Sequence, residues 1–99
     1  MFGKKISFYE CKDYIISNIK AFDFNVDENS QKCFSVKITQ GSRVIVITIS
    51  SYKRNKVNVD ILDSYGIIRI PKEDFSKMEE FKTFIVNSCN KILVALKRK

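Results

Sequence analysis

Between residues 33 and 61, three short segments alternate apolar and polar side chains, and this pattern constrains the fold more than any other feature. Residues 33–39 and 57–61 place their apolar side chains on one side only, whereas residues 44–50 are apolar on both sides. Polar, turn-forming residues separate them at positions 40–42 and 53–56. Because side chains alternate along a strand and short turns join antiparallel neighbours, the pattern predicts an antiparallel meander. The strand at 44–50 should be central or covered on its second side.

Two flanking segments decide whether the sheet has four or five strands. Phe24 and Val26 alternate with polar neighbours before the polar residues 27–30, so a short strand at 23–27 is one of two alternatives. Residues 67–70 predict a short last strand. Pro71 stops strand pairing there and suits the first turn of a helix.

A helix is predicted on each side of the strands. Ser7 and Glu10 have the spacing of a capping box, and apolar residues then recur every three or four positions up to Phe22. The same spacing runs from residue 75 to 96 and predicts a long second helix. The chain is therefore expected to be one α+β domain over residues 1–99. It should have two layers, with an N-terminal helix, a four- or five-stranded antiparallel meander sheet and a long C-terminal helix packed on one sheet face.

Several classes of function lack the residues that they need. Histidine is absent, which removes the usual general base and the commonest transition-metal ligand. Cys11, Cys33 and Cys89 are an odd number at wide spacing, so we expect reduced packing residues rather than a disulfide framework or a zinc site. No nucleophile–base pair or phosphate-binding loop is found, so we expect no enzymatic activity, no cofactor and no metal.

Neither a membrane span nor an export signal is recognised in the sequence. No apolar run approaches the 18 or so residues that a membrane-spanning helix requires. The first residues are not followed by an apolar signal region. We therefore expect an intracellular, cytoplasmic protein with no membrane partner.

The net charge of +7 is concentrated in a few places. Eight of the eighteen basic residues form three clusters: Lys4 and Lys5; Lys53, Arg54 and Lys56; Lys97, Arg98 and Lys99. Clustered charges add their potentials locally, whereas mixed charges cancel within about 10 Å. The clusters therefore favour a polyanionic partner, although the last one also suits the C-terminal end of a helix dipole.

By alternation, one face of the predicted sheet is left uncovered by helices. It carries Ser35, Lys37, Thr39, Val44, Val46, Thr48, Ser50, Tyr52, Asn58, Asp60, Ile67 and Arg69. This face has three interpretations: a solvated surface, a dimer interface through Val44 and Val46, or a platform on which unstacked bases rest. In the last case a base would stack on Tyr52 while neighbouring cations hold phosphates.

Residues 34–81 also carry a family resemblance. The run FSVKITQGSRVIVITISSYKRNKVNVDIL, closed by GIIRIPKEDFSKMEEF, resembles single-stranded nucleic-acid-binding domains of the Whirly, PUR-repeat and positive-cofactor-four type. The resemblance implies a curved sheet that binds single strands, often as a dimer. Asp60 on the binding face departs from that pattern. The positions implied for binding are Lys37, Tyr52, Lys53, Arg54, Lys56 and Arg69.

The sequence thus predicts a small, non-enzymatic protein that binds single-stranded DNA or RNA through a sheet face and a basic hairpin tip. The clusters at the chain ends would contribute secondarily. The alternative is a protein-interaction module: an adaptor, a chaperone-like protein or an inhibitor of a nucleic-acid-handling enzyme. In that case Val44, Val46 and Ile67 would be exposed together as a protein interface, and a homodimer is one form that this interface could take.

Overall fold

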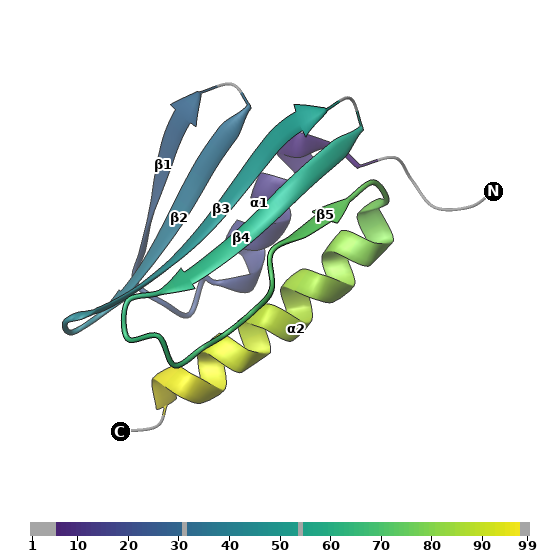
Figure 1. Ribbon diagram of the computed structural model, residues 1–99. Helices are drawn as coiled ribbons and strands as arrows, with labels where there is room; N and C mark the ends of the chain where they lie inside the picture. Colours follow the sequence, from purple (N-terminus) through teal and green to yellow (C-terminus); the bar gives the residue numbers. More distant parts are fainter. Residues whose placement is uncertain (1–5, 31, 54, 98–99) are drawn as a thin grey trace.

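The structure is a computed structural model that describes residues 6–30, 32–53 and 55–97, without the side chains of residues 29, 30, 52 and 53. Its elements confirm the predicted α+β class, with a helix before and a helix after a five-stranded antiparallel sheet (Figure 1). In chain order they are α1 (Phe8–Asn18), β1 (Phe24–Ser30), β2 (Cys33–Gln40), β3 (Arg43–Lys53), β4 (Lys56–Asp63), β5 (Glu73–Phe75) and α2 (Met78–Lys97).

The five strands form a meander in which spatial order follows chain order. Each strand pairs antiparallel with the next. At the centre of β3, Ile47 lies opposite Val36 of β2 and Ile61 of β4, and all three side chains are buried. The prediction that residues 44–50 form the central strand is therefore confirmed. The strand at 23–27, left open by the sequence, exists as β1.

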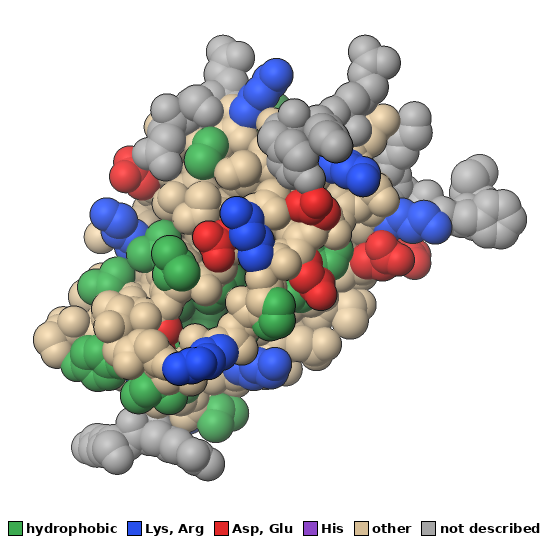
Figure 2. All heavy atoms as spheres, viewed as in Figure 1, with side chains coloured by type: hydrophobic (Ala, Val, Ile, Leu, Met, Phe, Trp, Pro, Cys, Tyr) green, Lys and Arg blue, Asp and Glu red, His purple; other side chains and the backbone are tan. Residues whose placement is uncertain are grey.

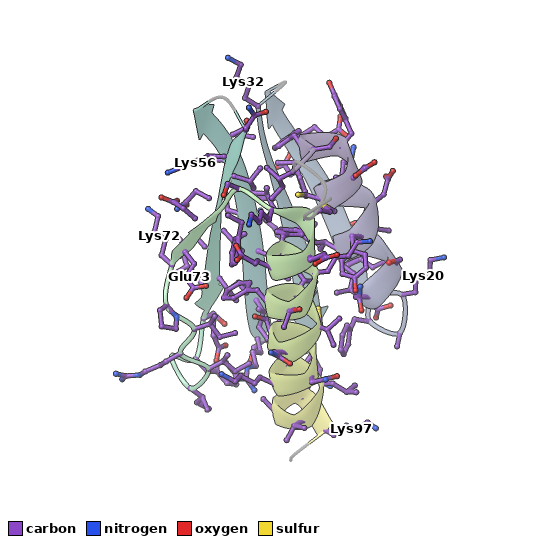
Figure 3. The ribbon with its side chains drawn as sticks, turned by 90° about the vertical axis from the view of Figure 1, so that its right-hand side faces the viewer. Lys20, Lys32, Lys56, Lys72, Glu73 and Lys97 are labelled. Atoms are coloured by element: carbon purple, nitrogen blue, oxygen red, sulfur yellow. The ribbon has the colours of Figure 1, made fainter. Side chains whose placement is uncertain are left out.

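Both helices lie on the same side of the sheet, as Figure 3 shows from the side. The apolar side chains of β2, β3 and β4 that face them are buried against the apolar stripes of α1 and α2. Phe34 and Phe81 are the largest of these side chains, and burial of each contributes roughly 2–3 kcal/mol of transfer free energy. The second face of the sheet is covered by neither helix.

The first helix begins where predicted but ends earlier. Ser7 is the N-cap, with the extended backbone that this position requires. However, its side chain makes no capping hydrogen bond, so the predicted capping box is not formed. The helix ends at Asn18, and Ile19 and Phe22 pack against the core from the turn that leads into β1. Helical spacing alone therefore overestimated the helix by one turn.

The predicted strand at 67–70 is wrong, and so is the helix start at Pro71. Residues 67–72 are irregular, the last strand is β5, and α2 begins at Met78. The reason is local: the amides of Ile67 and Ile68 both donate to the Asp63 carboxylate, so they are not available to a strand partner. β5 pairs with β4 instead, with Phe75 opposite Val57 and buried in the core.

Candidate functional site

The uncovered sheet face is rich in hydroxyl groups, as predicted. The hydroxyls of Ser35 and Thr48 lie 3.3 Å apart across β2 and β3, within hydrogen-bonding distance. Val44 and Val46 are half-buried on this face. Leu62, which the prediction did not include, lies opposite Val46 and is 60% exposed.

The middle of this face is not basic. The register places Asp27 opposite Ser35 and Asp60 opposite Thr48. A third carboxylate, Asp74 of β5, accepts a 2.7 Å hydrogen bond from the side-chain amide of Asn58. Lys37 lies among these groups and is exposed, and Figure 2 shows the mixture of acidic and basic side chains on this view of the molecule. Phosphate groups would therefore meet three carboxylates here, so the middle of the face offers little electrostatic attraction.

Positive charge gathers instead at one end of the sheet. Lys32 lies in the turn between β1 and β2, and Lys56 begins β4; both are exposed. The amide of Ser51 donates a 2.7 Å hydrogen bond to the Lys32 carbonyl. This bond joins the β1–β2 turn to the end of β3 that leads into the β3–β4 turn. Figure 3 shows Lys32 and Lys56 at the same end of the molecule. We call this region, with the β3–β4 turn, the basic end.

The other predicted basic positions are distributed as follows. Lys53 pairs in register with Lys56, which places its backbone at the basic end. The side chains of Tyr52 and Lys53 lie outside the described residues, as do Arg54, Lys4, Lys5, Arg98 and Lys99 in full. Lys97 lies at the opposite end of the molecule from Lys56, as expected for a helix that packs back across the sheet (Figure 3).

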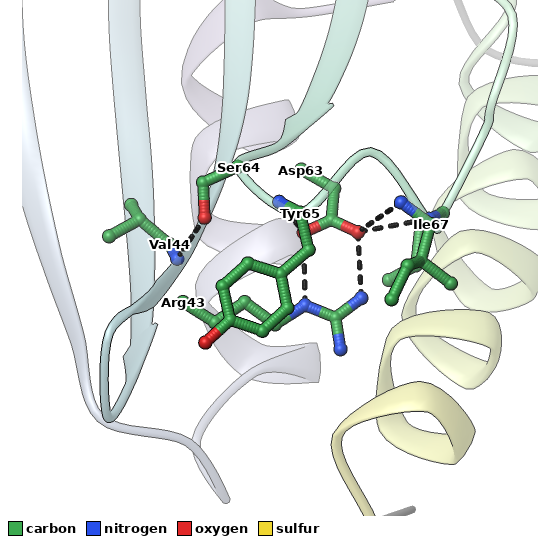
Figure 4. Close-up of polar contacts among 7 residues, drawn as sticks. Arg43, Val44, Asp63, Ser64, Tyr65 and Ile67 are labelled. Carbon is green, nitrogen blue, oxygen red and sulfur yellow. Dashed lines mark hydrogen bonds and ion pairs between the residues drawn. The ribbon is translucent and has the colours of Figure 1, made fainter.

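Arg69 and Ile67 are not part of the sheet face. Both belong to the irregular connection between β4 and β5, which runs beside the second half of α2. Figure 4 shows Val44 and Ile67 on opposite sides of Tyr65. Ile67 is therefore not placed together with Val44 and Val46.

An ion pair between Arg43 and Asp63 organises this connection. The Arg43 Nε and Nη2 donate to the two carboxylate oxygens of Asp63 at 2.9 and 2.7 Å, and both side chains are buried (Figure 4). The same carboxylate accepts the backbone amides of Tyr65, Ile67 and Ile68 at 2.9–3.1 Å. The hydrogen bonds from Arg43, followed by those from the three amides, hold the pKa of Asp63 far below its ordinary value, although burial opposes this.

The bonds to Asp63 give the connection one defined conformation. Gly66 adopts a left-handed backbone with φ of +69°, and its amide donates to the Asp63 carbonyl. The Tyr65 ring lies over the Arg43 guanidinium, and its hydroxyl bonds the Ser42 hydroxyl. Ser64 in turn exchanges two hydrogen bonds with the Val44 backbone.

An apolar groove of about 740 Å³ lies between this connection and α2. Its apolar side chains are prominent: Ile67 is 67% exposed, Val94 55% and Tyr65 52%. Figure 2 shows hydrophobic and basic side chains close together in the lower part of the view, where α2 ends. We call this feature the α2 groove. It is lined by Arg43, Tyr65, Ile67, Ile68, Arg69, Asn90, Lys91, Val94 and Ala95.

Sequence reasoning missed the Arg43–Asp63 pair, although a signal was present. Arg43 shares the core-facing alternation of Ile45, Ile47 and Ile49, and Asp63 shares that of Val59 and Ile61. Opposite charges at core-facing positions of two neighbouring strands indicate a buried ion pair, because an unpaired charge would be too costly to bury. The two residues lie twenty positions apart in the chain, so their pairing is not evident from local sequence.

The three cysteines are free thiols, as expected. Cys11 and Cys89 are buried, and burial raises their pKa values to about 12 and about 11. Cys33 is half-buried, with its sulfur 3.6 Å from the Ser50 hydroxyl.

No group of three or more Cys, Asp or Glu side chains within the described ranges could hold a metal ion. No helix in the described part of the chain is both long and apolar enough to cross a membrane.

Comparison of this chain with protein-family models, with curated proteins and with solved structures gave no significant match. The resemblance to Whirly, PUR-repeat and positive-cofactor-four domains therefore stays a prediction.

Proposed function

We propose that this protein is a non-enzymatic binding domain that recognises single-stranded DNA or RNA at the basic end of its sheet. The observation that carries the proposal is the meeting of two lysine-bearing turns at that end, where Lys32 and Lys56 are exposed. The β3–β4 turn also contributes Lys53 and Arg54 in sequence. Cations grouped on neighbouring turns can contact successive phosphates of one strand.

The sheet itself serves a smaller role in this proposal than the sequence suggested. Lys37 lies on the uncovered face, two positions farther from the basic end than Ser35, which pairs with Asp27 and Thr48. A strand that ran from the basic end toward Lys37 would therefore first meet Asp60 and Asp27, whose charges repel phosphate. The bound strand therefore crosses the end of the sheet rather than following its middle.

A binding role is favoured over catalysis by the residues available. The chain has no histidine. The pKa of the Asp63 carboxyl is strongly shifted, and the shift is downward because Asp63 is paired with Arg43. A general base near neutral pH needs a shift in the opposite direction. No cofactor is part of the proposal.

The proposal is tested by titrating the protein into a fluorescently labelled single-stranded oligonucleotide at several salt concentrations. Four cations are expected to contact phosphates: Lys32, Lys53, Arg54 and Lys56. The slope of log affinity against log salt should therefore be about −2.8. A flat salt dependence, or no binding at low salt to either DNA or RNA, would overturn the proposal.

The alternative function, a protein-interaction module, is favoured by a different observation. Leu62, Tyr65, Ile67 and Val94 are prominently exposed apolar residues around the β4–β5 connection, and monomeric domains rarely gather such residues without a use. We also propose that the protein is intracellular and that it can form a homodimer. Light scattering of the free protein tests the homodimer.

A further inference from the structure

We propose that the α2 groove binds an acidic, amphipathic peptide segment of another protein. This site lies apart from the basic end and does not depend on nucleic-acid binding. Three observations support the proposal. Exposed apolar side chains line the groove, two basic side chains lie beside them, and hydrogen bonds to Asp63 fix the β4–β5 connection that forms one side of the groove.

The apolar floor is supplied from both sides of the groove. Ile67 and Ile68 come from the β4–β5 connection, and Val94 and Ala95 come from α2. Ile67 and Val94 are each more than half exposed. Apolar side chains of a peptide would remove this surface from water, with a gain of roughly 25 cal/mol for each Å² buried.

The positive charge of the groove favours a negatively charged partner. Arg69 and Lys91 are exposed in its lining, and no Asp or Glu is among the described residues that line it. The positive charge of Arg43 is already matched by Asp63, whose carboxylate accepts five hydrogen bonds in all. The groove therefore carries two uncompensated cations, which complement carboxylates that flank apolar anchors.

The groove is preorganised by the Arg43–Asp63 pair. The carboxylate fixes the backbone of residues 65–68, so that Ile67 and Tyr65 are presented outward without a further ordering cost. A binding surface that is already ordered loses less entropy on association. An ordered groove favours a flexible peptide as the ligand, because the peptide is then the only partner that loses conformational entropy on binding.

Two other occupants are less well matched. A nucleic acid would find phosphate partners in Arg69 and Lys91, but the exposed isoleucine and valine offer no stacking surface for bases. A second copy of this chain would bring the same two cations toward the groove if the groove were the centre of a twofold interface. Like charges would then face one another.

The test uses the full chain and a synthetic peptide with leucines at every third and fourth position and glutamates between them. A matched peptide carries lysines in place of the glutamates. We expect the acidic peptide to bind with a dissociation constant below about 100 µM and to shift the amide resonances of Ile67, Arg69 and Val94. The lysine peptide should bind at least about tenfold more weakly.

Variants identify the groove as the site. Val94→Asp should weaken acidic-peptide binding by at least about tenfold, whereas Val86→Asp, in the same helix but outside the groove, should not. Lys91→Glu together with Arg69→Glu should reverse the preference between the two peptides, which a general loss of folding could not do. Circular dichroism melting of each variant verifies that it is folded.

Three outcomes would overturn the proposal. The first is no saturable binding of the acidic peptide up to about 1 mM. The second is equal binding of the two peptides, or resonance shifts confined to residues outside the groove. The third is a free protein that is dimeric and becomes monomeric on Val94→Asp, which would assign the groove to a second copy.

Discussion

Arg43 and Asp63 show how two side chains can determine the conformation of a whole connection. Each charge is costly to remove from water. The buried pair is tolerated because Asp63 accepts hydrogen bonds from the Nε and Nη2 atoms of Arg43 and from three backbone amides. Loss of either partner leaves the charge of the other buried without its counter-ion. The pair therefore acts on stability and on the shape of the α2 groove together.

Asp63→Asn is expected to lower the melting temperature by about 10 °C, because the Arg43 charge then has no buried counter-ion. Thermal unfolding followed by circular dichroism measures this. Asp60→Asn is the matched control, since Asp60 lies half-buried on the uncovered face of the same strand. Equal melting temperatures for the two variants would contradict the role given to Asp63.

The carboxylate of Asp63 also makes the free energy of unfolding depend on pH. Its pKa is lowered in the folded state, so the unfolded chain binds the proton more readily. The stabilisation is complete above the ordinary aspartate pKa of about 4 and is lost as the pH falls from there toward the folded value. Urea unfolding between pH 6 and about 2.5 should therefore show a steep loss below pH 4 that Asp63→Asn makes shallower. An unchanged slope in the variant would count against this assignment.

The cysteines should differ in reactivity. Burial raises the pKa of Cys11 to about 12 and that of Cys89 to about 11, so almost no thiolate forms at pH 8. Cys33 is half-buried on the uncovered face of the sheet, opposite Ser50. Under native conditions we expect one thiol to react with a chromogenic disulfide reagent at once, and all three after denaturation. Mass spectrometry should locate the fast label on Cys33, and early labelling of Cys11 would contradict this order.

At the scale of elements, alternation identified β2, β3 and β4 because each has one face in the core and local sequence records that burial. Apolar patterning gave a wrong prediction at residues 67–70, because Ile67, Ile68 and Ile70 form an apolar run typical of a buried strand although the segment is irregular. The single carboxylate of Asp63, four and five positions earlier, binds the backbone amides of Ile67 and Ile68. Nor could β5 be found, since Glu73 and Asp74 are polar and Phe75 is its one core residue.

The candidate site was predicted less completely than the fold, for the same physical reason. Charge clusters are visible in sequence, so the basic end was anticipated through Lys53, Arg54 and Lys56. Of the acidic residues that interrupt the uncovered face, Asp60 was expected there, whereas Asp27 and Asp74 became apparent only with the register of β1 and β5. The α2 groove depends on contacts between segments that are distant in the chain.

The β4–β5 connection itself can be tested at Gly66. Its φ of +69° is strained for any residue with a β-carbon, while no other atom lies within 4 Å of the place where one would stand. Gly66→Ala should therefore cost about 1 kcal/mol of unfolding free energy through the backbone alone. Gly66→Asn should cost less, because asparagine tolerates this conformation better. Urea unfolding measures both, and an alanine variant as stable as the parent would exclude this conformation.

Across the whole molecule, the net charge of +7 is divided between surfaces with different properties. The basic end presents lysines from two turns, the middle of the uncovered face carries carboxylates, and the α2 groove combines two cations with apolar side chains. The proposed nucleic-acid site and the proposed peptide site therefore use separate regions. Each can be removed by substitution without changing the other.

The most direct test of nucleic-acid binding compares two double variants that remove the same charge from different places. Lys32→Gln with Lys56→Gln removes both described lysines from the turns of the basic end, whereas Lys20→Gln with Lys97→Gln removes exposed lysines elsewhere (Figure 3). In a single-stranded oligonucleotide titration, the first pair should reduce the salt slope from about −2.8 to about −1.4 and weaken affinity about tenfold. The second pair should leave both unchanged. Equal weakening by the two pairs would contradict a defined site, because net charge alone would then govern binding.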